Sequence, residues 1–268
     1  ESYLVEPDAR GTCPVLAWAA WELQRLDPDA VLVSLHSDHL IRPLEGFRDT
    51  VRAAVHLART QDVLVTVGVE PDRVETGYGH IQPGQPLELP GADAYRIEAF
   101  HEKPDAETAR RDMDEGYLWN TGIFVWKASV FLDEVRRLAP EVADCFGTLE
   151  QHGAEAFFSE VPVCVVDTAV MERTDRAATV KAAFDWDDVG SWEALARTRT
   201  RDDAGNVTEG TGRVVDGRGN VVYAEGGEVV LFGTENLVVV QSGGTTLVMP
   251  RDRAAHLKSL LNRLEDDA

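Results

Sequence analysis

The stretch Val63-Leu64-Val65-Thr66-Val67-Gly68-Val69 indicates the fold class, because it is apolar or β-branched at almost every position. Residues 31–35 form a second run of this kind. Runs without polar alternation suit strands that are buried on both faces of a sheet. Between the two runs, apolar side chains recur at helical spacing and predict one stripe of an amphipathic helix: Phe47, Val51, Ala54, Val55 and Ala58.

Strand and helix patterns keep alternating to about residue 200. Thr12 and Pro14 mark the start of an earlier helix, since proline is tolerated in the first helical turn. Ser129 opens another helix and Pro140 closes it. Further strands are predicted at residues 96–100, 123–126 and 163–166. This alternation predicts a doubly wound α/β sheet.

The sequence changes character after Arg201, where Asp203-Ala204-Gly205-Asn206 forms a turn cluster. Short β runs separated by Gly or Asn follow: residues 213–215, 220–223, 228–232, 237–240 and 245–249. They predict a small all-β unit, either a coil of a β-helix or a compact sandwich. An apolar stripe predicts a closing helix: Leu257, Leu260, Leu261 and Leu264. The predicted domains are therefore 1–203 and 204–268.

Composition limits the classes of function. The chain has 268 residues and a formal net charge of −21, so nucleic acid is not an expected partner, because phosphate contacts need a basic face. Three widely spaced cysteines, Cys13, Cys145 and Cys164, predict neither a disulfide framework nor a zinc site, and favour the cytoplasm. No signal peptide is visible and no apolar run approaches the ~20 residues that span a bilayer, so we expect no membrane association.

Two aspartates are the first candidates for chemistry. Asp38 follows the run at residues 31–35, and ligands of open α/β sheets bind beyond the carboxyl ends of strands. Asp188 lies far along the chain, in the segment W-D-D-V-G-S-W of residues 186–192. If the fold brings the two together, they form a two-carboxylate cradle for a hard metal ion. Either aspartate alone is more often a solvated loop carboxylate.

Two glycine- and lysine-containing motifs add candidate ligand contacts. Gly77 and Gly79 flank Tyr78 in E-T-G-Y-G, and glycines let a backbone approach a ligand closely, although a tight turn explains them equally well. In E-K-P, Lys103 follows Glu102 at the end of a predicted strand. Lys103 is a point charge suited to a phosphate, or an ordinary surface lysine.

Two further motifs follow apolar runs or precede them. Asn120, two residues before Gly122 in W-N-T-G, suits the vicinal hydroxyls of a sugar, although a turn is the simpler explanation. Asp167 and Glu172 follow the run at residues 163–166; Glu172 suits a polyol, and a helix cap is the alternative. Among the histidines only His39 lies near a candidate site, and a packing or orienting role suits it better than a catalytic one.

In chain order these motifs are S-D-H, E-T-G-Y-G, E-K-P, W-N-x-G, A-V-M-E and W-x-D-V-G-S-W. In this order and spacing they resemble the mannose-1-phosphate guanylyltransferases of the sugar-phosphate nucleotidyltransferase family. The opening residues 6–14, E-P-D-A-R-G-T-C-P, are similar to that family's E-P-x-x-R-x-T-A-P, with Cys13 where alanine is usual. The resemblance runs from about residue 3 to 200, and the β tail resembles the family's short left-handed β-helix.

The resemblance implies a fold and a reaction. The fold is a Rossmann-like doubly wound mixed sheet of the nucleotide-diphospho-sugar transferase type. The reaction joins mannose 1-phosphate to GTP, giving GDP-mannose and pyrophosphate, with Mg²⁺ as the cofactor. The implied metal ligands are Asp38 and Asp188, with Lys103 as the third catalytic residue, on the sugar phosphate. The implied substrate-binding residues are Glu6 and Arg10 at the guanine side, Gly77, Glu102, Asn120 and Glu172 for the sugar, and in addition Tyr78.

One departure from the family pattern is large. The family begins with a strand that leads into G-G-x-G-x-R-L-x-P, whose backbone amides and Arg hold the triphosphate, and these residues do not occur here. We therefore expect the 268 residues alone to lack guanylyltransferase activity.

Several alternatives stay open on the sequence alone. In one alternative the protein is a sugar-1-phosphate nucleotidyltransferase that uses a different nucleotide base or a different sugar. In a second alternative it is a non-catalytic regulatory subunit that binds a sugar nucleotide. An isomerase domain has little room after residue 204. A homodimer through exposed apolar edges of the β unit is a further expectation.

Overall fold

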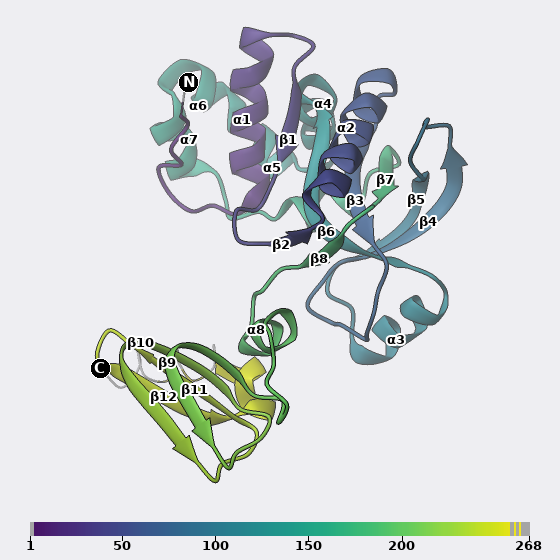
Figure 1. Cartoon of the computed structure of the whole chain (residues 1–268). Coiled ribbons are helices and arrows are strands. Elements are labelled where there is room, and N and C mark those ends of the chain that lie inside the picture. Colours follow the sequence, from purple (N-terminus) through teal and green to yellow (C-terminus); the bar gives the residue numbers. More distant parts are fainter. Residues whose placement is uncertain (1–2, 258–259, 261–262, 264–268) are drawn as a thin grey trace. The chain divides into compact units, whose positions relative to one another are not determined.

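The computed structural model describes residues 3–257, 260 and 263 (Figure 1). The chain divides into two compact units. The first comprises Glu1–Ser37 and Ile41–Trp186, and the second comprises Asp38–Leu40 and Asp187–Ala268. The division predicted from the sequence, at residues 203 and 204, stays a prediction.

The first unit is built on a mixed sheet. Among the described residues its strands run across the sheet in this order: β1 (Val31–Ser34), β6 (Leu118–Lys127), β3 (Leu64–Val69), β7 (Ala177–Lys181), β5 (Ala94–His101) and β4 (His80–Leu87). Strands β3 and β7 are parallel, and the other neighbours are antiparallel. The predicted mixed α/β sheet is therefore confirmed.

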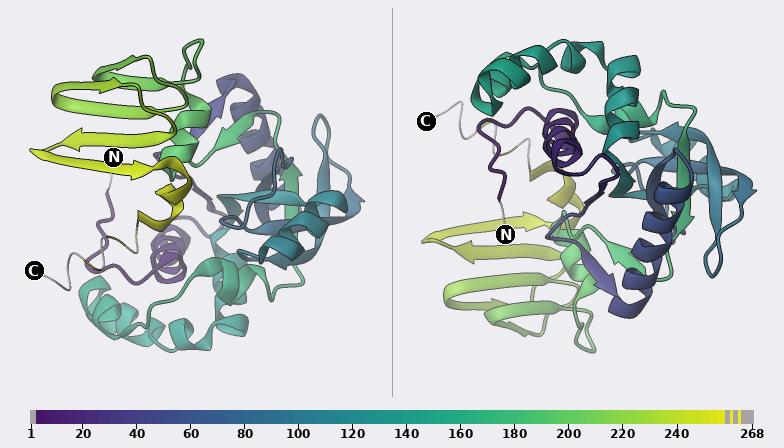
Figure 2. Two further views of the ribbon diagram at one scale, coloured as in Figure 1. Left: turned by 90° about the horizontal axis from the view of Figure 1, so that it is seen from below. Right: turned by 90° about the horizontal axis from the view of Figure 1, so that it is seen from above.

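Helices cover both faces of this sheet (Figure 2). Their bounds are α1 (Thr12–Leu26), α2 (Leu44–Thr60), α3 (Ala106–Asp114), α4 (Ala128–Leu138), α5 (Pro140–Ala143), α6 (Phe146–His152), α7 (Ala154–Glu160) and the π-helical turn η1 (Asp167–Met171). Side chains alternate between faces, so Leu64 packs with the cluster under α1 and α4, whereas Val65 packs against α2. The helices predicted from Thr12, from the stripe at 47–58 and from Ser129 are all confirmed.

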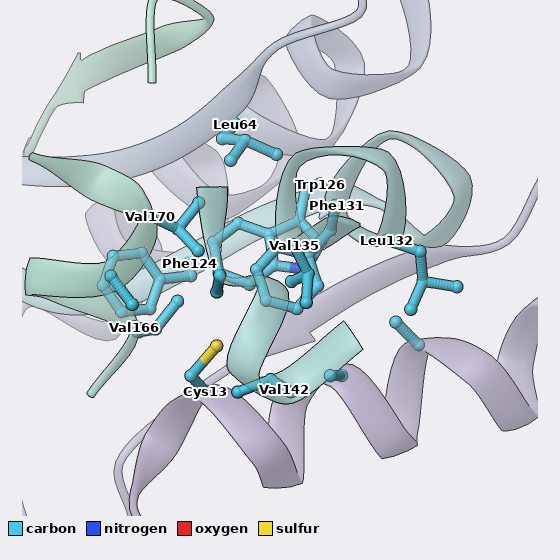
Figure 3. Close-up of a cluster of buried hydrophobic side chains, with 14 of the residues drawn as sticks. Cys13, Leu64, Phe124, Trp126, Phe131, Leu132, Val135, Val142, Val166 and Val170 are labelled. Atoms are coloured by element: carbon cyan, nitrogen blue, oxygen red, sulfur yellow. The ribbon is translucent and has the colours of Figure 1, made fainter. Parts of the chain in front are cut away.

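The larger core lies between the sheet and helices α1 and α4 (Figure 3). Trp126 of β6 stacks on Phe131 of α4, with ring centroids 4.3 Å apart. Cys13, at the start of α1, is fully buried in the same cluster. This apolar layer fixes β6 against the helices, and β6 carries Asn120 at its other end.

The strand predicted at residues 163–166 is wrong. Val163 is 69% exposed, and residues 162–165 form a loop that leads into η1, with Val166 already helical. The amide of Cys164 donates to the carbonyl of Arg10 at 2.9 Å, and that of Val166 donates to Oγ1 of Thr12 at 2.9 Å. The backbone is therefore satisfied by the segment that enters α1, so the apolar run needs no strand partner.

The second unit is a β-helix-like coil. Helix α8 (Trp192–Thr198) precedes four strands of one sheet: β9 (Val207–Val215), β10 (Val221–Phe232), β11 (Leu237–Ser242) and β12 (Thr245–Pro250). Strands β9, β10 and β11 are parallel neighbours, and β12 returns antiparallel to β11. Parallel neighbours so close in sequence are typical of a β-helix and not of a sandwich of hairpins, so the β-helix alternative is confirmed.

One strand of this unit differs from the sequence-based prediction, and a short helical turn follows the last strand. The runs predicted at 220–223 and 228–232 are one strand, β10, whose register is irregular between Ala224 and Val229. A 3₁₀ turn, η2 (Arg251–His256), follows β12. Of the predicted closing helix, Leu261 and Leu264 lie outside the described residues.

A short two-stranded sheet pairs β2 (Leu40–Arg42) with β8 (Asp185–Asp187). Asp38 stands just before β2, and Asp188 comes directly after β8. The pairing therefore makes neighbours of two segments that are far apart in sequence.

Candidate active site

The edge where β4 and β6 begin brings several predicted residues together. His80 of β4 is opposite Trp119 of β6, and the amide of Asn120 donates to the carbonyl of Gly79 at 2.8 Å. The end of the E-T-G-Y-G segment thus lies against the W-N-T-G segment. We call Glu102, Lys103, Asn120, Asp167 and Glu172 the polar edge.

Asn120 is the fixed point of the polar edge. Its side chain is held from both ends, and the residue is only 8% exposed. The hydroxyl of Thr66 donates to Oδ1 at 2.6 Å, and the amide of Gly122 donates to the same atom at 3.2 Å. Nδ2 in turn donates to Oδ1 of Asp167 at 3.0 Å. These donors and acceptors leave one orientation for the amide group.

Asp167 is a carboxyl group of the polar edge with a raised pKa. Burial, and after it the nearby charge of Glu102, raise its pKa to about 6, although Lys103 and Asn120 act in the opposite direction. Two carboxylates this close repel each other unless a proton, a cation or a donor lies between them. Carboxyl groups with pKa values perturbed in this way are enriched at functional sites.

Glu102 and Glu172 belong to the same edge. The amide of Glu102 donates to Oε1 of Glu172 at 3.0 Å, which joins the end of β5 to the residue after η1. A Cβ atom at Gly79 would come within 2.9 Å of Oε2 of Glu102. Glycine at position 79 therefore lets the Glu102 carboxylate lie against the backbone.

Lys103 supplies a cation among these acids. Its backbone has a positive φ of 48°, which turns the chain sharply after β5. Nζ is 2.5 Å from Oε1 of Glu102, and this hydrogen bond raises the pKa of Lys103. The side chain is 62% exposed, so it reaches solvent at the rim of the polar edge. An exposed lysine beside acidic groups suits a ligand that carries both hydroxyls and a phosphate.

The E-T-G-Y-G segment is ordered by its own side chains. The amide of Gly77 donates to Oε1 of Glu75 at 3.0 Å. The ring of Tyr78 meets Trp119 edge-on at 5.3 Å and Trp186 at 5.0 Å between centroids. These aromatic contacts connect the segment to β6 and to β8.

Arg73, which lies outside every motif selected from the sequence, stabilises this aromatic group. Its guanidinium carbon lies 4.7 Å from the centroid of the Trp119 ring and 5.8 Å from that of Tyr78. Cation–π contacts of a partly buried arginine hold both rings. No local sequence pattern signals this contact, because Arg73 follows a Pro-Asp turn and reads as a surface residue.

Asp38 and Asp188 belong to the second compact unit, which takes in Asp38–Leu40 together with the chain from Asp187 onward. Within the short segment 36–39, the ligand atoms of His36, Asp38 and His39 all lie within 4.8 Å of one another. The amide of Gly190 donates to Oδ1 of Asp188 at 3.2 Å. The predicted joint coordination of one ion by Asp38 and Asp188 stays a prediction.

Asp187, the neighbour of Asp188, has a structural role. Its Oδ2 accepts two hydrogen bonds from Arg197, at 2.7 and 3.1 Å, and its Oδ1 accepts one from the amide of Val189 at 2.9 Å. It is a buried residue. Of the two adjacent aspartates, Asp187 is therefore the one whose side chain stabilises the fold.

Glu6 and Arg10 lie beside α7 instead of at the polar edge. The amide of Arg10 donates to Oε1 of Glu6 at 3.3 Å. The Arg10 guanidinium donates to the carbonyl of Phe158 at 2.9 Å and pairs with Asp8 at 2.8 Å. Their contacts hold the segment before α1 on α7, and their predicted base-recognition role stays a prediction.

No helix in the described part of the chain is long and apolar enough to cross a membrane.

Comparison with known proteins agrees with this arrangement. The family model described as Nucleotidyl transferase matches residues 1–204, and the MannoseP isomerase/GMP-like beta-helix domain matches residues 212–264. Enzymes of the first family use a nucleoside triphosphate, a sugar 1-phosphate and a divalent metal ion.

Curated relatives cover nearly the whole chain. A mannose-1-phosphate guanylyltransferase of Klebsiella pneumoniae is 34% identical over 98% of this chain and 58% of its own length. The xanthan biosynthesis protein XanB of Xanthomonas campestris is 37% identical over 98% of this chain and 57% of its own length. The chain thus spans a little over half the length of the curated relatives it matches.

Solved structures give the same result. The crystal structure of a mannose-1-phosphate geranyltransferase from Thermus thermophilus has a TM-score of 0.87 and 35% identity, and covers 98% of this chain and 77% of that one. A mannose-6-phosphate isomerase from Helicobacter pylori has a TM-score of 0.60 and 26% identity, over 69% of this chain and 73% of that one. By the matched residues and the shared architecture, the chain belongs to the nucleotidyl transferase family.

Proposed function

We propose that the full-length protein is a mannose-1-phosphate guanylyltransferase, which makes GDP-mannose and pyrophosphate from GTP and mannose 1-phosphate. One observation carries the proposal: relatives of that name are 34% identical over 98% of this chain. The polar edge supports it, since it combines acids, an amide and a lysine as a sugar phosphate requires.

The reaction is a single in-line displacement. A phosphate oxygen of the sugar attacks the α-phosphorus of GTP, a new P–O bond forms, the bond from the α-phosphorus to the bridging oxygen breaks, and pyrophosphate leaves. The attacking oxygen already carries a negative charge, so no general base is required. Alignment and charge neutralisation lower the barrier.

The polar edge binds the sugar in this proposal. Asn120, whose amide orientation is fixed, and the carboxylates of Glu102 and Glu172 hydrogen-bond the hydroxyl groups. Lys103, exposed at the rim, neutralises the phosphate. Gly77 and Tyr78 present a close-lying backbone and an aromatic wall on the other side of the ring.

The carboxylates of Asp38 and Asp188 hold Mg²⁺ in this proposal. Hard oxygen donors fit that ion, which takes one or two protein carboxylates and leaves its other positions to phosphates and water. The pairing of β2 with β8, directly beside the two residues, supports their joint use. When bound, the ion supplies charge neutralisation on the phosphates.

Glu6 and Arg10 are proposed at the guanine side. A carboxylate accepts two N–H donors of guanine, which uracil does not offer, so this position favours GTP. A homodimer remains a prediction. A cytoplasmic location also remains a prediction, and the three cysteines, which are free thiols in the structure, are consistent with it.

The test is a pyrophosphate-release assay on the full-length protein with Mg²⁺. We expect GTP with mannose 1-phosphate to give the highest kcat/KM among GTP, ATP and UTP combined with mannose or glucose 1-phosphate. A preference for UTP or for glucose 1-phosphate would assign another sugar nucleotidyltransferase. Binding of GDP-mannose without turnover under all these conditions would instead indicate a regulatory subunit.

A further inference from the structure

Three ionisable side chains lie directly behind the polar edge, and the proposed reaction does not use them: His80, His101 and Asp112. His80 is the first residue of β4, His101 is the last of β5, and Asp112 projects from α3. Asp112 is fully buried and His80 is 1% exposed. We call these three residues the His–Asp–His trio.

Both histidines converge on one oxygen of Asp112. Nδ1 of His101 lies 2.9 Å from Oδ2 with hydrogen-bond geometry. Nδ1 of His80 lies 3.2 Å from the same oxygen, although at an angle that gives no hydrogen bond. Because an ionised carboxylate only accepts, the His101 ring donates in this contact. Asp112 is thus the common partner of the histidines at the facing ends of two paired strands.

Each histidine is joined by one peptide bond to a residue of the site. His80 follows Gly79, and its Nε2 lies 2.9 Å from the carbonyl oxygen of Glu75, to which it donates. That contact closes the five-residue E-T-G-Y-G segment onto β4. His101 precedes Glu102, and its ring stacks on Tyr117 at 5.4 Å between centroids. A shift of either ring would therefore move one wall of the sugar site.

Net stability does not account for this arrangement. Burying a carboxylate costs desolvation free energy that an apolar side chain of similar volume would avoid. Oδ1 of Asp112 accepts no hydrogen bond from the described residues, and Arg111 is 3.8 Å away. What the carboxylate does supply is a hydrogen-bond acceptor for His101 and a close contact for the ring of His80, which gives both rings a defined position, as residues that support a binding site must.

We infer that Asp112 is a positioning residue for the sugar phosphate. Through His80 and His101 it fixes the E-T-G-Y-G segment relative to Glu102 and Lys103. The inference rests on the proposed function for its substrate, whereas the fixed geometry itself does not depend on that function. A displacement of about 1 Å at a binding site costs up to about 100-fold in rate.

The experiment compares Asp112→Ala, Asp112→Asn and His101→Phe in the full-length protein. Asp112→Asn keeps an acceptor oxygen, and His101→Phe keeps the stack on Tyr117 while removing the donor. The matched control is Asn220→Ala, which removes a fully buried polar side chain of the second unit. Two measurements are made: amide hydrogen exchange of residues 75–80 without ligands, and KM for each substrate.

We expect faster exchange at residues 75–80 in Asp112→Ala and His101→Phe, and unchanged exchange there in Asn220→Ala. The KM for mannose 1-phosphate should rise about 10-fold, while the KM for GTP stays within about twofold, and Asp112→Asn should recover part of the loss. If Asp112→Ala does not fold, His101→Phe gives the same test.

Unchanged exchange at residues 75–80 in the variants would overturn the inference, and so would an equal rise of both KM values. If the wild-type protein does not turn over mannose 1-phosphate at all, the proposed function fails, and hydrogen exchange alone decides the positioning role.

Discussion

Buried asparagines have different roles in the two units of this chain. In the β-helix-like unit, Oδ1 of Asn220 accepts from the amide of Leu237 at 3.1 Å, and its Nδ2 donates to the carbonyl of Thr234 at 2.9 Å. At the polar edge, Asn120 instead donates to Asp167, an acid whose pKa burial and Glu102 have raised. Asn220 thus satisfies backbone groups, whereas Asn120 donates to a carboxyl group whose charged form is disfavoured by burial and by Glu102.

This difference separates structure from function more reliably than burial does. Both residues are buried, and both are hydrogen-bonded on each side. Asn220 joins neighbouring coils, since it also donates to Oδ1 of Asn206 at 3.1 Å. A polar group bonded to backbone is typical of a structural role, and one bonded to a perturbed carboxyl group indicates a site.

The adjacent aspartates of the 185–190 segment give the largest expected effect. We expect Asp188→Asn to lower kcat/KM by about 10³-fold, or about 4 kcal/mol, because it removes a proposed metal ligand. The control is Asp187→Asn, which weakens the pair with Arg197. It should lower the free energy of unfolding by about 2 kcal/mol. A steady-state assay and urea unfolding separate the two, and full activity of Asp188→Asn would remove that residue from the mechanism.

The two asparagines themselves provide a matched pair of alanine substitutions. We expect Asn220→Ala to lower the free energy of unfolding of the β unit by about 3 kcal/mol, since the carbonyl of Thr234 and the amide of Leu237 lose their partners. Asn120→Ala should lower kcat/KM for mannose 1-phosphate by about 100-fold, equivalent to about 2.7 kcal/mol. Denaturant unfolding and initial rates measure the two effects. The comparison fails if Asn220→Ala is the variant with the larger loss of activity.

The smallest expected effect concerns Asp167 and the direction in which its raised pKa makes the free energy of unfolding depend on pH. The pKa of about 6 in the folded protein lies above that of an unfolded aspartate, so the folded state holds more protons between about pH 4 and 6. The contribution of Asp167 to stability is therefore most favourable below pH 4, declines up to about pH 6, and stays constant above. Asp167→Asn should remove this dependence and stabilise the protein at pH 8 by about 1 kcal/mol, allowing for solvent screening.

Urea unfolding of wild type and Asp167→Asn at pH 4.5 and pH 8 measures this difference. From pH 4.5 to pH 8, the free energy of unfolding of the wild type should change less favourably than that of Asp167→Asn. A larger increase in the wild type than in the variant would contradict the raised pKa of Asp167.

Much of the α/β unit could be predicted, because helices and buried strands have their own sequence periods. The stripe at 47–58 buries one face of a helix, and the run at 63–69 is buried at every position of its strand. The strand predicted at residues 163–166 was wrong because the prediction relied on their apolar character. Only Cys164 and Val166 are buried, and they pack in the cluster that contains α1. Apolar content alone does not distinguish a strand from a loop that packs on a helix.

The site was predictable only in part. Glu102, Asn120 and Glu172 could be selected because they follow or begin apolar runs, and the fold does bring them to one edge. The His–Asp–His trio has no such signal, since His80, His101 and Asp112 come from three elements whose approach depends on the pairing of β4 with β5. Arg73 was missed because cation–π contacts follow no spacing rule.

The irregular register of β10 has a consequence for how the β-helix-like unit can vary in length. Asn206 and Asn220 are 14 residues apart, whereas the paired side chains of Arg218 and Glu235 are 17 apart. The chain between Ala224 and Val229 absorbs the surplus, since β9 and β10 resume their pairing beyond it. Insertions or deletions should therefore be tolerated there, while a single added residue between the asparagines would uncouple the coils.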